Sequence, residues 1–98
     1  MIKMTILYYR PDDPQAFEEY YMDKHLPLAR QIPGLRKIEV GPVLKCPKDP
    51  DYFWSAECYF DTVEDLKAGF GSPAGAAAGQ DAASFAPKGN ISFISEVR

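Results

Sequence analysis

The pattern of apolar residues predicts an α+β protein with a ferredoxin-like β-α-β-β-α-β arrangement. Three observations support this prediction. Apolar residues recur with the period of a strand at 1–10, 35–44, 52–60 and 91–97. Helical patterns follow the first and the third of these segments. The chain has 98 residues, which suits one domain, 1–98. We therefore expect a four-stranded antiparallel sheet with the helices on one face.

Two of the predicted strands have side chains of different character on their two faces. The apolar face of the first strand carries Ile2, Met4, Ile6 and Tyr8, and its mixed face carries Lys3, Thr5, Leu7 and Tyr9. The third strand carries Tyr52, Trp54, Ala56, Cys58 and Phe60 on one face, and Phe53, Ser55, Glu57 and Tyr59 on the other. Large rings on both faces favour a central strand that is covered on both sides.

The first helix contains the only histidine of the chain. Asp13 followed by Pro14 predicts its start, and Pro33-Gly34 predicts its end. One arc of this helix carries Phe17, Tyr21, His25, Leu28 and Ile32. His25 should therefore face whatever the helix packs on.

Pro27 should disturb this helix two residues after His25. It has no N–H to donate, and it disfavours helical angles at Leu26. The helix should either kink there or stop and restart with Pro27 in a new first turn. A carbonyl freed beside His25 makes this a plausible place for a pocket.

The segment after the third strand predicts two further helical pieces. Thr62 caps the first, and Ser72-Pro73 caps the second, which extends to about Phe85. Glycines interrupt the alanines of the second piece, so a linker or low-complexity segment is the alternative for 71–86. Pro87 to Asn90 should form the turn into the last strand, which carries Ile91, Phe93, Ile94 and Val97.

The face of the sheet opposite the helices should be an interface. It would expose Leu7, Tyr9, Phe53 and Tyr59 in a monomer, beside polar residues that include Glu57. We therefore predict a C2 homodimer in which two sheets close into a barrel. Glu57 would either pair with Lys3 at this interface or act as a second acid–base group, and its place on the face away from His25 favours the pairing.

Composition excludes several classes of function. The net charge is −3 and the chain has no basic run, which argues against nucleic acid as a partner. No apolar run is long enough to span a membrane, and no signal-peptide pattern is present, so we expect a cytoplasmic protein. Cys46 and Cys58 have no metal-ligand spacing, and a disulfide between them is improbable. No nucleophile–base pair, phosphate-binding glycine loop or metal cluster is apparent, so hydrolase, NTPase and metalloenzyme functions have no support, and we predict neither a metal nor a cofactor.

The chain resembles the EthD-like family of dimeric α+β barrel proteins. The residues that carry the resemblance are Ile2–Tyr9, the helix with Phe17, Tyr20-Tyr21 and His25-Leu-Pro-Leu28, Pro33-Gly34-Leu35, Tyr52–Phe60 and Ser72-Pro73-Ala-Gly75. The resemblance implies the fold, the dimer, and a pocket between the first helix and the sheet. It also implies a link to catabolism of small organic compounds, with lactone isomerases, polyketide cyclases and monooxygenases among the relatives. The family histidine would correspond to His25.

His25 has three interpretations. As a general acid or base it would move a proton on a ligand that is bound by the rings of Tyr8, Tyr21 and Trp54. As a structural residue it would bond a free carbonyl or an acid such as Asp23 or Glu57, and the rings would be ordinary core. Haem ligation is a third interpretation, which the small apolar surface of the domain disfavours.

Two functional hypotheses follow. The first is a cofactor-free enzyme that performs proton-transfer chemistry, such as isomerisation or cyclisation, on a small apolar organic compound. The second is a non-catalytic ligand-binding or accessory protein of a catabolic pathway. The sequence does not decide whether the protein is an enzyme.

Overall fold

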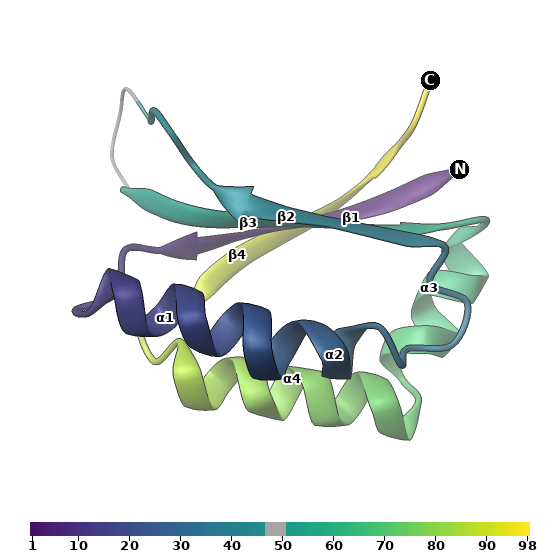
Figure 1. Cartoon of the computed structure of the whole chain (residues 1–98). Coiled ribbons are helices and arrows are strands. Elements are labelled where there is room, and N and C mark those ends of the chain that lie inside the picture. The colour runs from purple at the N-terminus through teal and green to yellow at the C-terminus, as the bar shows by residue number, and fades with distance from the viewer. Residues whose placement is uncertain (47–50) are drawn as a thin grey trace.

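One antiparallel sheet lies against a layer of helices (Figure 1). The computed structural model describes residues 1–46 and 51–98. In chain order the elements are β1 (Ile2–Tyr9), α1 (Pro14–Tyr20), η1 (Tyr21–His25), α2 (Leu26–Ala29), β2 (Lys37–Pro42), β3 (Tyr52–Phe60), α3 (Val63–Phe70), α4 (Pro73–Phe85) and β4 (Asn90–Glu96). The predicted α+β fold class is confirmed.

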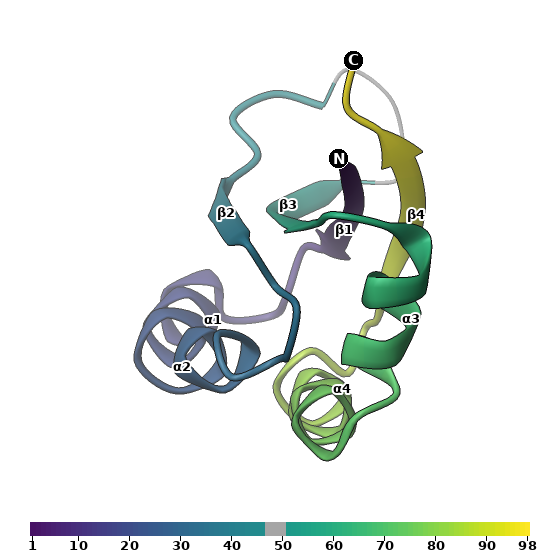
Figure 2. The ribbon, with the colours of Figure 1, turned by 90° about the vertical axis from the view of Figure 1, so that its right-hand side faces the viewer.

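The sheet has the ferredoxin-like strand order β2-β3-β1-β4. β1 pairs antiparallel with both β3 and β4, so that Ile6 lies between Ala56 and Ser92. β1 and β3 therefore form the centre of the sheet, and their apolar faces lie against the helices. Both crossover connections pass on the same side of the sheet (Figure 2).

A β-bulge near the start of β3 corrects the predicted faces of that strand. Tyr8 pairs with Trp54, but Tyr9 pairs with Tyr52, so Phe53 is an extra residue. Tyr52 consequently stacks on Tyr9, with 5.4 Å between ring centroids. Phe53 was expected on the open face, but it is buried in the core. The period-two pattern cannot place residues on either side of such an insertion.

The first helix continues through Pro27 by widening one turn. Asp13 Oδ1 accepts a hydrogen bond from the Ala16 N–H at 3.1 Å, which confirms the predicted cap. Residues of η1 adopt π-helical bonding, and the Leu26 N–H donates to the carbonyl of Tyr21, five residues earlier. Because Pro27 cannot donate and its ring crowds the preceding turn, the wider turn accommodates it without ending the helix.

The wider turn shifts every side chain that follows it. Leu28 was expected on the buried arc but is only half-buried, whereas Leu26 and Ala29 are buried. The extra residue in the turn rotates the later residues around the helix axis relative to an α-helical register. His25 lies before this shift and keeps its predicted inward orientation.

The glycine-rich segment is a helix, so the linker alternative for 71–86 is wrong. Ser72 Oγ accepts from the Gly75 N–H at 3.1 Å and caps α4, as the sequence predicted. Gly75 allows α4 to approach α3 closely, since a Cβ atom there would lie 2.4 Å from the carbonyl oxygen of Gly69. Gly75 therefore serves the close packing of α4 on α3.

The described helices leave the other face of the sheet uncovered (Figure 2). On this face Lys3 Nζ lies 2.7 Å from Glu57 Oε2, so the predicted pair is present. Tyr59 Oη donates to Glu39 at 2.7 Å. The edge strand β4 adds apolar surface here, with Phe93 49% exposed.

Candidate functional site

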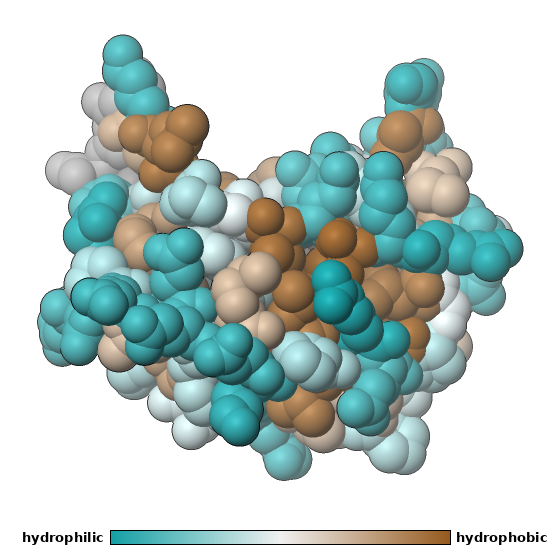
Figure 3. All heavy atoms as spheres, in the orientation of Figure 1, coloured by the Kyte–Doolittle hydropathy of each residue, from teal (hydrophilic) through white to brown (hydrophobic). Residues whose placement is uncertain are grey.

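A cavity of about 380 Å³ lies between the helices and the sheet. The sheet contributes apolar side chains that include Met4, Ile6, Ile38, Ala56 and Cys58. The first helix contributes Tyr21, His25 and Ala29, and α4 contributes Ala78, Gly79, Ala82 and Ala83. Apolar residues gather on the molecular face shown in Figure 3, between the edge of the sheet and the helix layer. The small residues of α4 leave space that larger side chains would fill.

His25 lies at the end of η1 and is 5% exposed. Its Nδ1 atom is 3.0 Å from Oδ2 of Asp81, a residue of α4. The other carboxylate oxygen of Asp81 accepts a hydrogen bond from the Tyr20 hydroxyl at 2.6 Å. The three side chains thus connect the first helix to α4, and His25 is the member of this group that lines the cavity.

The electrostatics of this group favour a neutral imidazole at neutral pH. Burial lowers the pKa of His25 below its ordinary value, and the hydrogen bond to Asp81 only partly opposes that effect. A carboxylate accepts, so Nδ1 carries the proton and Nε2 keeps its lone pair. No described residue forms a hydrogen bond with Nε2. Nε2 is also not one of the side-chain polar atoms that are fully buried without a partner. The lone pair is therefore accessible from the cavity.

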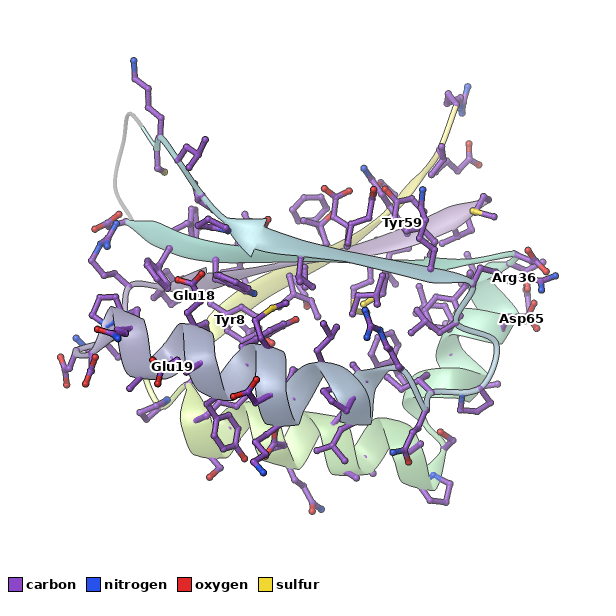
Figure 4. The ribbon with its side chains drawn as sticks, in the orientation of Figure 1. Tyr8, Glu18, Glu19, Arg36, Tyr59 and Asp65 are labelled. Atoms are coloured by element: carbon purple, nitrogen blue, oxygen red, sulfur yellow. The ribbon has the colours of Figure 1, made fainter. Side chains whose placement is uncertain are left out.

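Tyr8 and Tyr21 line the same cavity. Each is 1% exposed, and their ring centroids are 5.9 Å apart. The Tyr21 ring also lies 4.9 Å from the His25 ring. Figure 4 shows Tyr8 pointing from the sheet towards the helices. Burial raises the pKa of both phenols, so both stay protonated at neutral pH.

Trp54 is placed differently from the other predicted site residues. It is buried in the core cluster and does not contact the cavity. Its ring centroid is 5.1 Å from that of Tyr21, so it packs on Tyr21 from the core and supports the cavity wall indirectly. The indole N–H is near enough to the Tyr21 hydroxyl to lower that group's pKa slightly against burial, but it lacks hydrogen-bond geometry.

The residue that sequence reasoning missed is Asp81. The expected acidic partners of His25 were wrong, because Asp23 is exposed and Glu57 pairs with Lys3 on the far side of the sheet. One signal was available: Asp81 is the only charged residue between Lys67 and Lys88.

Residues 1–46 and 51–98 contain no group of three side chains that could hold a metal ion. Within those residues, no helix has the length and apolar character needed to cross a membrane.

Comparison with known proteins places the chain in a family. The model of the EthD domain matches residues 10–89. The chain belongs to the EthD family. A Rhodococcus erythropolis relative, an uncharacterised 11.0 kDa protein of the thcB–thcC intergenic region, is 38% identical in an alignment over 93 residues that covers 91% of this chain and 87% of the relative.

Solved structures agree with this assignment. An ethyl tert-butyl ether D (EthD) family protein from Bacillus halodurans is 37% identical, with a TM-score of 0.91 over 100% of this chain and 99% of that one. A dimeric ferredoxin-like protein of unknown function from Thermobifida fusca has a TM-score of 0.75 at 16% identity, over 98% of this chain and 90% of that one. The second likeness supports the ferredoxin-like fold alone.

Proposed function

We propose that this EthD-family protein is a cofactor-free enzyme that transfers a proton on a small apolar organic molecule. The observation that carries the proposal is the 3.0 Å contact between His25 Nδ1 and Asp81, which leaves Nε2 free on an apolar cavity. A base with a free lone pair, a lowered pKa and a fixed tautomer is suited to accept a proton near neutral pH.

Asp81 acts in this proposal as a positioning residue. It fixes the imidazole tautomer, and it stabilises the imidazolium that forms when Nε2 takes a proton. The Tyr20 hydroxyl holds the second oxygen of the carboxylate at 2.6 Å. Removal of the carboxylate charge should therefore reduce turnover more than it reduces ligand affinity.

Tyr8 and Tyr21 are proposed to contact the ligand. Their rings form part of the cavity wall next to His25. Trp54 is proposed to act indirectly, because its ring supports Tyr21 from the core. Apolar walls with a few polar atoms suit a small, largely apolar molecule such as those degraded in catabolic pathways.

A second candidate is a ligand-binding or accessory protein without catalysis. One observation favours it: the Tyr20–Asp81–His25 bonds also tie the first helix to α4. That network would maintain the shape of the cavity even if no proton moved.

One experiment separates these candidates. Aromatic compounds and lactones are screened for binding by calorimetry and for conversion by NMR, and His25→Gln and His25→Ala are tested on each ligand found. Turnover that is lost while binding is retained supports the enzyme. Binding without turnover by the native protein supports the accessory role. Absence of binding by every compound contradicts both.

We also propose that the protein forms a C2 homodimer through the open face of its sheet. Phe93 is 49% exposed and Ile91 is 36% exposed on this face. The Thermobifida fusca protein of the same fold is described as dimeric. Burial of these side chains against a second copy would remove apolar area from water. A cytoplasmic location remains our proposal from the sequence.

A further inference from the structure

The hydroxyls of Tyr8 and Tyr21 are polar groups of the cavity wall that proton transfer by His25 does not itself use. Both rings are 1% exposed, and both residues line the cavity. The Tyr8 hydroxyl makes no hydrogen bond to residues 1–46 and 51–98, and the Trp54 N–H near the Tyr21 hydroxyl lacks hydrogen-bond geometry. A buried phenol without a partner is costly, so the pair requires an explanation.

These hydroxyls are open to the cavity. Trp54 Nε1 is the one side-chain polar atom that is fully sealed without a partner among residues 1–46 and 51–98. The hydroxyl oxygens of Tyr8 and Tyr21 are therefore in contact with open space, although their rings are buried.

Two hydrogen-bond donors, the hydroxyls of Tyr8 and Tyr21, and one acceptor, Nε2 of His25, thus lie around the same apolar cavity. The Tyr21 ring is 5.9 Å from the Tyr8 ring and 4.9 Å from the His25 ring. The two phenols are also close enough for Tyr8 to raise the pKa of Tyr21. Such an arrangement matches a ligand that has an oxygen acceptor next to an acidic C–H bond.

We infer, resting on the proton-transfer function proposed above, that the substrate is a neutral apolar carbonyl compound whose carbonyl oxygen accepts from Tyr8 and Tyr21. Ketones, esters and lactones with a C–H beside the carbonyl belong to this class. Tyr8 and Tyr21 become the oxyanion site of the reaction.

The chemical step balances without another reactant. The Nε2 lone pair of His25 takes the proton of the C–H beside the carbonyl. The C–H electron pair becomes the C=C bond of an enolate, and the carbonyl π pair moves onto oxygen. The two phenol O–H groups stabilise this charge, and the imidazolium then returns the proton to a carbon of the same molecule.

A neutral substrate fits the charges better than an anionic one. The Asp81 carboxylate is near enough to raise the pKa of Tyr8, so its field would oppose a permanent anion in the cavity. Negative charge that develops only during the reaction is balanced by the imidazolium that forms at the same time. Apolar walls further disfavour a ligand that arrives charged.

The test uses 1-indanone as the carbonyl probe and indane as a matched ring without oxygen. Infrared spectroscopy reports the carbonyl stretch of bound indanone, and NMR in D₂O reports exchange of its C–H beside the carbonyl. We expect the stretch to move to lower frequency in the native protein, and to move back in Tyr8→Phe and Tyr21→Phe. Each variant should lose about threefold to tenfold in indanone affinity and none in indane affinity. Exchange should slow on the order of 100-fold in each variant.

His25→Gln keeps this inference separate from the proposed function. In this variant exchange should stop while the shifted stretch remains, since both phenols are unchanged. If the carbonyl stretch of bound indanone is the same in the native protein and in both Phe variants, the oxyanion site is overturned and the proton-transfer function is not. Exchange that persists in His25→Gln overturns the proton-transfer function instead. Failure of the native protein to bind either ring overturns both.

Discussion

The two faces of the sheet differ in whether their polar side chains are hydrogen-bonded to one another. On the open face Lys3 pairs with Glu57 and Tyr59 donates to Glu39, so these groups satisfy one another. On the helix-covered face Tyr8 lines the cavity, and its hydroxyl has no hydrogen-bond partner among the described residues. Figure 4 shows Tyr8 and Tyr59 on opposite sides of the sheet. Polar groups that are already hydrogen-bonded are typical of a surface or an interface, whereas a buried polar group without a hydrogen bond is available to a ligand.

The largest expected effect compares one carboxylate from each face. Asp81→Asn keeps the shape of the side chain but removes the charge that fixes the His25 tautomer. We expect kcat for any substrate found to fall by about 100-fold, with KM little changed. Glu57→Gln makes the same chemical change on the open face and should leave kcat unaffected. Equal losses in the two variants would contradict the distinction between the faces.

The next effect concerns association through the open face. Phe93→Asp places a charge on the proposed interface, and should raise the dimer dissociation constant by about tenfold or more. Met22→Asp is the matched control, because Met22 is 45% exposed but belongs to the helix layer. Sedimentation velocity over a concentration series measures both. A dimer that is weakened only by Met22→Asp would place the interface on the other side of the molecule.

A smaller effect is the pH dependence of stability. The pKa of His25 is lowered in the folded protein, so the unfolded chain binds a proton more readily. The free energy of unfolding should therefore fall as the pH drops through about 6.5, where the unfolded histidine titrates. His25→Gln should show a shallower fall between about pH 8 and pH 5.5 in urea titrations. An identical slope in the two proteins would mean that His25 is not desolvated.

The smallest effect is expected for the ion pair on the open face. Lys3 and Glu57 side chains are 30% and 32% exposed. Lys3→Met should change the free energy of unfolding by less than about 1 kcal/mol, since partly exposed pairs contribute little. Urea titration in the Phe93→Asp background, at concentrations where sedimentation velocity shows a monomer, measures this term without the interface. A loss of several kcal/mol would show that the open face depends on this pair far more than we infer.

The sequence predicted the elements of the fold because their signals are local. Asp13 and Ser72 cap helices through neighbouring N–H groups, so spacing alone identifies them. The inward orientation of His25 follows from its position on one helix. The observed structure differs from the prediction where one residue is inserted into a regular element. These places are the wider turn at Pro27 and the bulge at Phe53, and neither alters the apolar pattern nearby.

The candidate site could be predicted only in part, since its main contact joins distant segments. His25 and Asp81 are 56 residues apart, and no local pattern relates them. The isolation of Asp81 among alanines and glycines was the one available signal. Pairing across the molecule depends on how α4 packs on the first helix, which hydrophobic periodicity does not specify.

The central claim is tested most directly by the ¹⁵N NMR spectrum of the single histidine, which needs no assignment. Titration of the native protein and Asp81→Asn gives both the tautomer and the pKa of His25. We expect a proton on Nδ1, a free Nε2 and a pKa below the ordinary 6.5 in the native protein, with the Nδ1 tautomer no longer fixed in the variant. A proton on Nε2, or a pKa above 6.5, would contradict the proposed base.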